Sequence, residues 1–466
     1  MANQLVYDIH DKPKFPQLLV FAIQQLLAIM AATITVPMMV GNGMSVSAAL
    51  FGAGVGTLVY QLFTRFRSPV FLGSSFAFIG PMVAAFAGAI GNGYLGYTGL
   101  IVGAAFAALV YVIIALVVKY AGTAWIDKIM PAAVIGPTVA LIGLSLAGAA
   151  INDAFSYGNK VVFGVSSYFE MNTTIWLSLI CALVTFFVVI ICSVYGKNMI
   201  KLIPFIIGIL AGYGVALIFT VIGYIAGADA WKIIDFAPFK ALVADGVTFK
   251  TFFSLPEFTF VNAFKGMEHF SWSYLATVAI AYTPVAFVVF AEHLADHKNL
   301  STIIGRDLLK DPGLDRTLLG DGVGSLAGAF FGGCPNTTYG ESVGCVAITK
   351  NASIITITVT AFISMIVSFV SPFVAFLDSI PGCVMGGACI TLYGFIAVSG
   401  LKMIQKVNLE DNANLFTVSA ILIPGVGGMA MAIGGKVYIT TVACALVLGI
   451  VTNVVLTKLK KTKKED

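Results

Sequence analysis

Four acidic residues fall within or beside long apolar stretches of this 466-residue chain: Glu292, Asp296, Asp321 and Glu341. A charge at the centre of a bilayer costs about 3 kcal/mol on insertion scales, so ionisable residues there usually bind a polar solute or move protons. Glu292 and Asp296 are four residues apart, which places them on one face of a helix. Two carboxylates held that close in a low dielectric resist simultaneous ionisation. We therefore expect Glu292, Asp296 and Asp321 to take part in proton exchange.

Histidines and cysteines add no metal-binding pattern to these acidic residues. His293 follows Glu292 directly, but neighbouring residues on a helix point in different directions, so His293 is expected to face elsewhere. His297 is expected at the cytoplasmic edge of the membrane, in contact with water. The four histidines and seven cysteines show no metal-ligand spacing and no CxxC pair. We expect buried free thiols, no metal and no cofactor other than protons as the coupling ion.

Two apolar segments contain residues that break helices. The first, within 69–89, carries GSSFAFIGP (73–81), and the second, within 335–349, begins with PNTTYGESVG (335–344). Unwound backbone at membrane depth must line a cavity or be buried in protein, because lipid cannot satisfy its hydrogen bonds. A half-helix that starts there directs N–H groups and partial positive charge at the site. Interrupted segments in corresponding positions of two halves indicate a transporter binding site.

The residue types around these segments suit a neutral, planar ligand. Carboxylates accept hydrogen bonds from ring N–H groups, and backbone N–H groups at the broken segments donate to carbonyl oxygens. Phe76, Phe78 and Tyr339 offer flat apolar faces for stacking. This chemistry fits a nucleobase, but the residue types alone do not choose among nucleobases.

The rest of the chain must hold these groups within a membrane. Hydrophobic residues make up 59% of the chain, charged residues 10%, and the mean hydropathy is +0.97. A helical span needs about 20 apolar residues, and we predict an all-α polytopic membrane protein with about fourteen spans. The predicted spans are 17–36, 47–64, 69–89, 98–118, 132–150, 173–195, 200–226, 273–295, 317–333, 335–349, 352–377, 383–400, 413–434 and 437–457. The first is too long for a cleavable signal.

Charge placement predicts the orientation of these spans. With a cytoplasmic N-terminus, most of the 26 Lys and Arg residues fall in cytoplasmic segments, as the positive-inside rule expects. Both termini are then cytoplasmic, and 227–272 is a long exterior loop that separates the repeats 1–226 and 273–466. Seven spans in each half give the halves opposite orientations, which is typical of an inverted repeat. The cytoplasmic loop 297–316 is expected to form a surface helix and a turn at 311–313.

The motifs reached above resemble the nucleobase–cation symporter family, which includes uracil permeases and nucleobase–ascorbate transporters. The similarity covers nearly the whole chain, and PNTTYGE (335–341) resembles the uracil branch rather than the purine branch. The resembling stretches are GSSFAFIGP (73–81), AEH (291–293), RDLLKDPGL (306–314), PNTTYGES (335–342) and IPGCVMGG (380–387).

The resemblance implies a fold and an activity. Two inverted seven-span repeats form a core domain from spans 1–4 and 8–11 and a gate domain from spans 5–7 and 12–14. Short strands in spans 3 and 10 cross near the membrane centre. The implied function is import of a nucleobase, uracil, by proton symport with alternating access in the cell inner membrane. Such proteins contact membrane lipid and often form homodimers through their gate domains, and no nucleic acid is an implied partner.

The resemblance also implies roles for individual residues. Glu292 is similar to a span 8 carboxylate that bonds to the base, and Glu341 to its span 10 counterpart. Gly340 and Phe76 match positions that contact the base through backbone groups. The matches to pocket-wall positions are Ala32, Tyr339 and Tyr393.

Three departures from the family pattern bear on the polarity of the pocket. Asp296 stands where some uracil permeases have a His, Gln24-Gln25 stands where they have Gln-His, and Ser342 stands where Asn is common. We hypothesise that Asp296 replaces the His as the relay partner of Glu292.

Other functions remain open on the same fold. The first is transport of xanthine, uric acid or another purine, and the second is transport of an anion, which two glutamates facing the site disfavour. An enzyme is not expected, because an intramembrane aspartyl protease needs Gly-x-Gly-Asp and the chain has Leu318-Leu319-Gly320-Asp321. No nucleophile elbow, HExxH or phosphate loop is present in the sequence.

Overall fold

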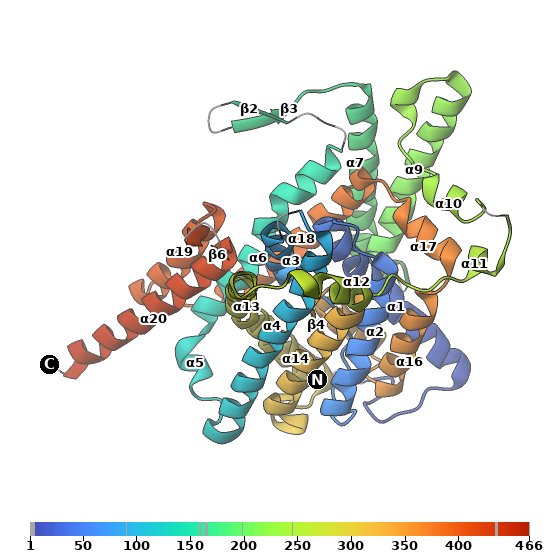
Figure 1. Ribbon diagram of the computed structural model, residues 1–466. Helices are drawn as coiled ribbons and strands as arrows, with labels where there is room; N and C mark the ends of the chain where they lie inside the picture. The colour runs from blue at the N-terminus through green and yellow to red at the C-terminus, as the bar shows by residue number, and fades with distance from the viewer. Residues whose placement is uncertain are drawn as a thin grey trace. The chain divides into compact units, whose positions relative to one another are not determined.

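The protein is described by a computed structural model, shown in Figure 1, that folds mainly as helices. The structure describes residues 5–89, 91–156, 158, 160–163, 166–197, 199–244, 246–433 and 437–465. Two compact units can be distinguished by their internal contacts. Unit 1 comprises Met1–Ser145, Pro256–Met365 and Phe395–Asp466, and unit 2 comprises Leu146–Leu255 and Ile366–Gly394.

Unit 1 holds most of the long helices and two of the small sheets. Its first elements are α1 (Phe15–Val40), α2 (Val46–Phe63), β1 (Leu72–Ser74), η1 (Phe76–Phe78), α3 (Ile79–Gly88), α4 (Gly93–Ala121), α5 (Ile126–Ile129) and the start of α6 (Ala132–Ala154). Its middle elements are α12 (Thr259–Gly266), η3 (Met267–His269), α13 (Trp272–Ile304), η4 (Leu309–Gly313), α14 (Leu314–Gly332), β4 (Asn336–Thr338), α15 (Gly340–Thr349) and α16 (Ile354–Val367). Its last elements are the end of α18 (Gly382–Ile404), α19 (Asn412–Val426), β5 (Met431–Ile433), β6 (Val437–Ile439) and α20 (Thr441–Glu465).

Unit 2 is smaller and is built around two long apolar helices. It holds the end of α6, β2 (Lys160–Phe163), β3 (Ser166–Phe169), α7 (Thr173–Tyr195), α8 (Met199–Leu202), α9 (Pro204–Ala226), η2 (Asp229–Trp231), α10 (Ala237–Ala241), α11 (Phe249–Phe252), α17 (Ser371–Asp378) and the start of α18. Strands β2 and β3 form an antiparallel hairpin, visible in Figure 1. The long predicted exterior loop, 227–272, therefore contains short helices in both units.

Helix lengths and surfaces suit a bilayer. Among the described residues, nine helices have at least 18 residues and enough apolar character to cross a membrane, and three shorter apolar helices accompany them. Large apolar side chains on α7 and α9 are exposed, including Trp176, Phe187, Ile218 and Ile225. Such surfaces indicate contact with lipid rather than water. The count of fourteen spans and their grouping into inverted repeats stay predictions.

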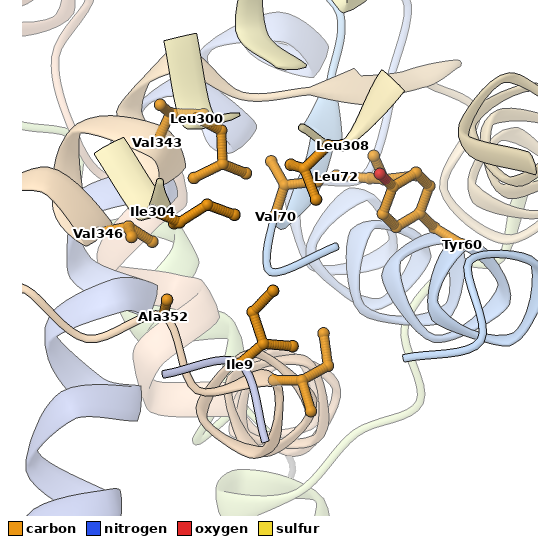
Figure 2. Packing of buried hydrophobic residues seen from close by; sticks show 11 residues of the cluster. Ile9, Tyr60, Val70, Leu72, Leu300, Ile304, Leu308, Val343, Val346 and Ala352 are labelled. Atoms are coloured by element: carbon orange, nitrogen blue, oxygen red, sulfur yellow. The ribbon is translucent and has the colours of Figure 1, made fainter. Parts of the chain in front are cut away.

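Helix α13 extends further than its sequence suggested. The predicted span ended at 295, yet α13 continues to Ile304 and ends at Gly305, whose φ of 69° is the left-handed conformation typical of a helix end. The extension is stable because Leu300 and Ile304 are buried in an apolar cluster. Figure 2 shows this cluster, which also contains Ile9 from the N-terminal segment and Val343 from α15. The turn expected at 311–313 falls at the end of η4, where Asp311 has non-helical backbone angles and the chain kinks before α14.

Candidate functional site

The two helix-breaking segments meet as a pair of antiparallel strands. In β1 and β4, Gly73 pairs with Thr337, and the ladder contains only three residue pairs. A Cβ atom at Gly73 would lie 2.2 Å from the Tyr339 ring, so only glycine permits this close crossing. The Tyr339 hydroxyl donates a hydrogen bond to the Ser74 carbonyl oxygen at 2.8 Å, which holds the ring across β1. The strands expected in spans 3 and 10 are thus present and paired.

Each strand leads into a short helix that starts at the crossing. Helix α15 begins at Gly340, directly after β4, and η1 begins at Phe76, directly after β1, and continues into α3. The first N–H groups of a helix have no acceptor within the helix, and they carry partial positive charge. Glu341 lies in the first turn of α15, so its carboxylate partly offsets that charge. The start of α15 therefore offers both donors and an acceptor.

A small cavity of about 70 Å³ lies at this crossing, within unit 1. Such a cavity is far smaller than the several hundred Å³ that drug-sized ligands occupy, and it suits a small solute. Its walls come from η1, α6, α13, β4, α15 and α18. The lining residues are Ser75, Phe76, Val139, Glu292, Ala295, Asp296, Thr337, Tyr339, Gly340, Glu341, Phe395, Ile396 and Ser399.

The acidic residues converge on this cavity from two elements. Glu292 and Asp296 both point into it from α13, as their spacing of four residues predicted. Asp296 Oδ2 accepts a hydrogen bond from the Thr338 hydroxyl at 2.9 Å. A Cβ atom at Gly340 would lie 3.8 Å from Asp296 Oδ1, so the bare backbone of α15 faces this carboxylate. Glu292, Asp296 and Glu341 lie within electrostatic range of one another, which disfavours ionisation of all three at once.

The structure places most of the predicted site residues together. The six that line the cavity are Glu292, Asp296, Glu341, Gly340, Phe76 and Tyr339. Ala32 is buried in α1 and is not among the lining residues. Tyr393 is buried in the part of α18 that belongs to unit 2. Asp321 is buried in α14, where it pairs with His293.

Two lining residues were missed by the sequence interpretation. The hydroxyl oxygen of Ser75 is buried at the cavity and has no hydrogen-bond partner in the described part of the chain, and Thr337 lines the same cavity close to Asp321 and Tyr111. A buried polar group without a partner loses free energy, so it favours a ligand that can supply the missing bond. Both lie inside the helix-breaking segments, and that position was the signal that could have identified them.

A neighbouring face of α13 carries a buried histidine network. His293 Nδ1 lies 2.7 Å from Asp321 Oδ2, and its Nε2 lies 3.0 Å from the Thr317 hydroxyl. His297 stacks on His293 with ring centroids 4.0 Å apart. The expectation that His297 contacts water is wrong: its side chain is 1% exposed, and Nε2 lies 2.8 Å from the Tyr60 hydroxyl. The physical reason is that α2 and the extended α13 pack at this point and exclude water.

A polar contact joins α1 to the second broken segment. The Gln25 side chain donates to the Ser342 hydroxyl oxygen at 2.5 Å, and the Phe71 N–H donates to the same oxygen at 3.0 Å. Ser342 directly follows Glu341 in the first turn of α15. Two of the three departures from the family pattern, at positions 25 and 342, are therefore bonded to each other and hold the start of α15.

Comparison with known proteins identifies relatives along nearly the whole chain. A match to the Permease family covers residues 16–434. The uracil permease of Bacillus caldolyticus is 36% identical over 457 residues, which cover 97% of this chain and 95% of the relative. The uracil permease of Escherichia coli (strain K12) is 31% identical and covers 98% of this chain and 95% of its own length.

Solved structures with low sequence identity share the fold. The transmembrane domain of a cyanobacterium bicarbonate transporter, BicA, superposes with a TM-score of 0.59 at 13% identity, over 97% of this chain and 100% of that chain. The murine Slc26a9 anion transporter in the inward-facing state superposes with a TM-score of 0.62 at 10% identity, over 97% of this chain and 70% of that chain. Identities this low carry information about the fold alone.

Proposed function

This chain belongs to the permease family of nucleobase–cation symporters, and from that premise we propose that it imports uracil together with protons. The observation that carries the proposal is the convergence of Glu292, Glu341 and the bare backbone of Gly340 on one small cavity where two broken segments cross. Relatives named uracil permease, matched over nearly their full length, support the choice of cargo.

The proposed binding mode uses the chemistry of the cavity walls. The carboxylates of Glu292 and Glu341 accept hydrogen bonds from the ring N–H groups of the base. Backbone N–H groups at the start of η1 and α15, near Phe76 and Gly340, donate to its carbonyl oxygens. Phe76 and Tyr339 supply flat apolar surfaces beside the ring.

Proton coupling is assigned to the acidic residues around this cavity. Asp296 is the relay partner of Glu292, because both carboxylates share one face of α13 and Asp296 also bonds to Thr338. Asp321 takes part from α14. Four carboxyl groups within mutual electrostatic range cannot all be charged in a low dielectric, so binding of a neutral base and of protons is coupled through them.

Transport follows alternating access between two domains. The core domain comprises spans 1–4 and 8–11, and the gate domain comprises spans 5–7 and 12–14. The spans belong to two inverted seven-span repeats, 1–226 and 273–466. The protein lies in the inner membrane with both termini in the cytoplasm. Two copies associate through their gate domains within the lipid. The distribution of basic residues supports the orientation, and the match to inward-facing transporter folds supports the architecture.

Two alternative cargoes are less well supported. Against a purine such as xanthine or uric acid, PNTTYGE (335–341) resembles the uracil branch rather than the purine branch, and the relatives reported above are named uracil permeases. An anion, as carried by the fold relatives, would meet Glu341 at the positive end of α15 and Glu292 opposite. No enzymatic step is part of the proposal.

Uptake of radiolabelled uracil into proteoliposomes tests the proposal. An interior made alkaline should stimulate uptake, and unlabelled uracil should block it while xanthine, uric acid and thymine compete less well. If only xanthine or uric acid blocks uptake, the purine alternative replaces uracil. If bicarbonate or sulfate enters instead, the anion alternative replaces uracil.

A matched pair of variants separates the site from general damage. Glu292→Gln removes the charge at the cavity and keeps the shape, whereas Glu268→Gln makes the same change at an exposed position of η3. Loss of uptake in the first variant alone supports the proposed site. Equal uptake by both variants contradicts the role of Glu292.

A further inference from the structure

The buried pair His293–Asp321 lies outside the cavity, where His293 projects from a neighbouring face of α13. We infer that this pair carries the transported proton, which His293 binds and releases at Nε2 while Asp321 holds the ring and balances its charge. The inference rests on the proposed function and deepens its coupling step. It starts from three observations. His293 Nδ1 lies 2.7 Å from Asp321 Oδ2, both side chains are almost completely buried, and the Thr317 hydroxyl lies within hydrogen-bond distance of His293 Nε2.

Hydrogen-bond donors and acceptors set the number of protons in the pair. The Thr317 hydroxyl has one proton, and it can donate to the Leu314 carbonyl oxygen at 3.1 Å or to His293 Nε2 at 3.0 Å. When it donates to Leu314, Nε2 must carry a proton and donate to the hydroxyl oxygen. One further proton then lies between Nδ1 and Oδ2, and the pair is neutral overall.

Release of one proton needs only a rotation of the Thr317 hydroxyl. Nε2 gives up its proton and becomes an acceptor, the hydroxyl turns from Leu314 to Nε2, and Nδ1 keeps its N–H for the Asp321 carboxylate. The pair then has one negative charge, and the released proton leaves along the transport pathway. Both states keep every ring nitrogen bonded, so the pair can change its charge without leaving a buried nitrogen unsatisfied.

His297 differs from His293 because it has no carboxylate partner. Its Nδ1 lies 2.9 Å from the His293 carbonyl oxygen, which can only accept, so Nδ1 must carry a proton. Its Nε2 lies 2.8 Å from the Tyr60 hydroxyl and 3.4 Å from the Ser68 hydroxyl, and the Tyr60 hydroxyl also donates to Ser68. The two stacked histidines are therefore a contrast: His293 has a negative partner that balances a second proton, whereas His297 has only neutral partners.

The pair is connected to the cavity through two elements. Glu292, which lines the cavity, directly precedes His293 on α13, so a shift of this helix moves both groups. Thr337 of β4 lines the cavity and lies close to Asp321, whose Oδ1 has no hydrogen-bond partner in the described residues. Occupation of the cavity can therefore change the surroundings of Asp321 without direct contact.

The other titratable groups facing the pair are few. Tyr111 of α4 packs edge-on against His293 at 6.3 Å between ring centroids. Glu292 and Asp296 interact electrostatically with Asp321 from α13, and Tyr60 does so from α2. These carboxylates repel a negative Asp321, so the pair keeps its proton while any of them is charged and gives it up more readily once they are neutral.

Uptake and exchange measured on the same proteoliposomes test the inference. A gradient of one pH unit supports about tenfold accumulation of a solute that moves with one proton. Exchange of internal for external uracil at equal pH needs no net proton movement. We expect His293→Gln and Asp321→Asn to exchange uracil but to lose the accumulation. His297→Gln, which supplies one donor and one acceptor as the neutral ring does, should keep both activities.

Thr317 offers a milder second test that does not depend on the buried pair remaining folded after mutation. Thr317→Val removes the rotating hydroxyl at nearly constant shape, and Thr317→Ser keeps it. We expect the pH at half-maximal accumulation to shift in the first variant and not in the second. Accumulation by His293→Gln at the wild-type level, with unchanged pH profiles for both Thr317 variants, would overturn the inference. Failure of the proposed function is distinct, because wild-type protein itself would then fail to exchange uracil.

Discussion

The two faces of α13 carry ionisable side chains only one residue apart in sequence, yet their surroundings differ completely. Glu292 and Asp296 are half-buried at the cavity, beside the bare backbone of α15. His293 and His297 are fully buried, and both nitrogens of each ring have a hydrogen-bond partner. The cavity face has hydrogen-bonding groups that a ligand can reach, whereas the hydrogen bonds of the two histidine rings are completed by other residues of the protein.

This difference teaches that depth of burial alone does not identify a binding group. A buried side chain whose hydrogen bonds are complete stabilises the fold, and a ligand has little to add to it. A side chain next to free helix N–H groups and to unpaired hydroxyls such as Ser75 lacks such partners. Mutations on the cavity face should therefore change transport, and those on the histidine face should change stability or coupling.

The largest effect is expected at Glu292. A hydrogen bond to a charged group contributes about 1.5–3 kcal/mol, so Glu292→Gln should weaken uracil binding roughly 10- to 100-fold. Thermal unfolding in detergent should stay close to wild type, because the cavity face is not part of the packed network. Isothermal titration of uracil into purified protein measures the binding. Wild-type affinity in this variant would remove the distinction between the two faces.

Asp296→Asn tests the second residue of the cavity face. An amide cannot exchange a proton, so uptake should become nearly independent of external pH, and gradient-driven accumulation should fall by up to about tenfold per pH unit. Wild-type uptake, by contrast, should rise as the external pH falls. Initial rates of uptake over a series of external pH values provide the measurement. A pH profile that matches wild type would show that Asp296 is not the relay partner of Glu292.

Tyr60→Phe tests the histidine face with the opposite outcome. Removal of this hydroxyl leaves His297 Nε2 and Ser68 without their short partner and should lower the free energy of unfolding by about 1–2 kcal/mol. Uracil affinity should not change, because Tyr60 is not among the residues that line the cavity. Denaturation in detergent measures the stability of this variant, and a titration with uracil measures its affinity. A large loss of affinity with unchanged stability would reverse the assignment of the two faces.

The smallest effect is expected at Thr338, which contacts the cavity face indirectly. Thr338→Val removes the donor to Asp296 and should cost about 1 kcal/mol, equivalent to a change of roughly fivefold in uptake at limiting uracil. Thr338→Ser keeps the donor and serves as the control. Similar uptake by the two variants would indicate that this hydrogen bond does not position Asp296.

Local pattern was sufficient to locate much of the cavity. Helical spacing put Glu292 and Asp296 on one face, and the helix-breaking residues around Gly73 and Gly340 indicated where backbone would open. Residue types also indicated Glu341 and Phe76, and resemblance to a family added Gly340. Ala32 and Tyr393 are not among the lining residues, because a match of sequence position does not specify which side chains reach a cavity.

The histidine network could not be predicted in the same way. His293 bonds to Asp321, 28 residues later, and His297 lies beside Tyr60, 237 residues earlier. These contacts depend on how α2, α13 and α14 pack, and no local spacing encodes that packing. A helix was expected after residue 297, but its continuity with α13 and its burial were missed for a related reason, since they depend on the apolar cluster that includes Ile9.

The sequence by itself determined the class of this protein, because apolar runs of span length are local properties of the chain. It also predicted which acidic residues fall within or beside those runs. The tertiary structure decided which partners those residues have: Thr338 for Asp296, His293 for Asp321, and the start of α15 opposite Glu292. A buried charge takes its properties from its neighbours, and its neighbours are set by the packing of segments that are distant in sequence.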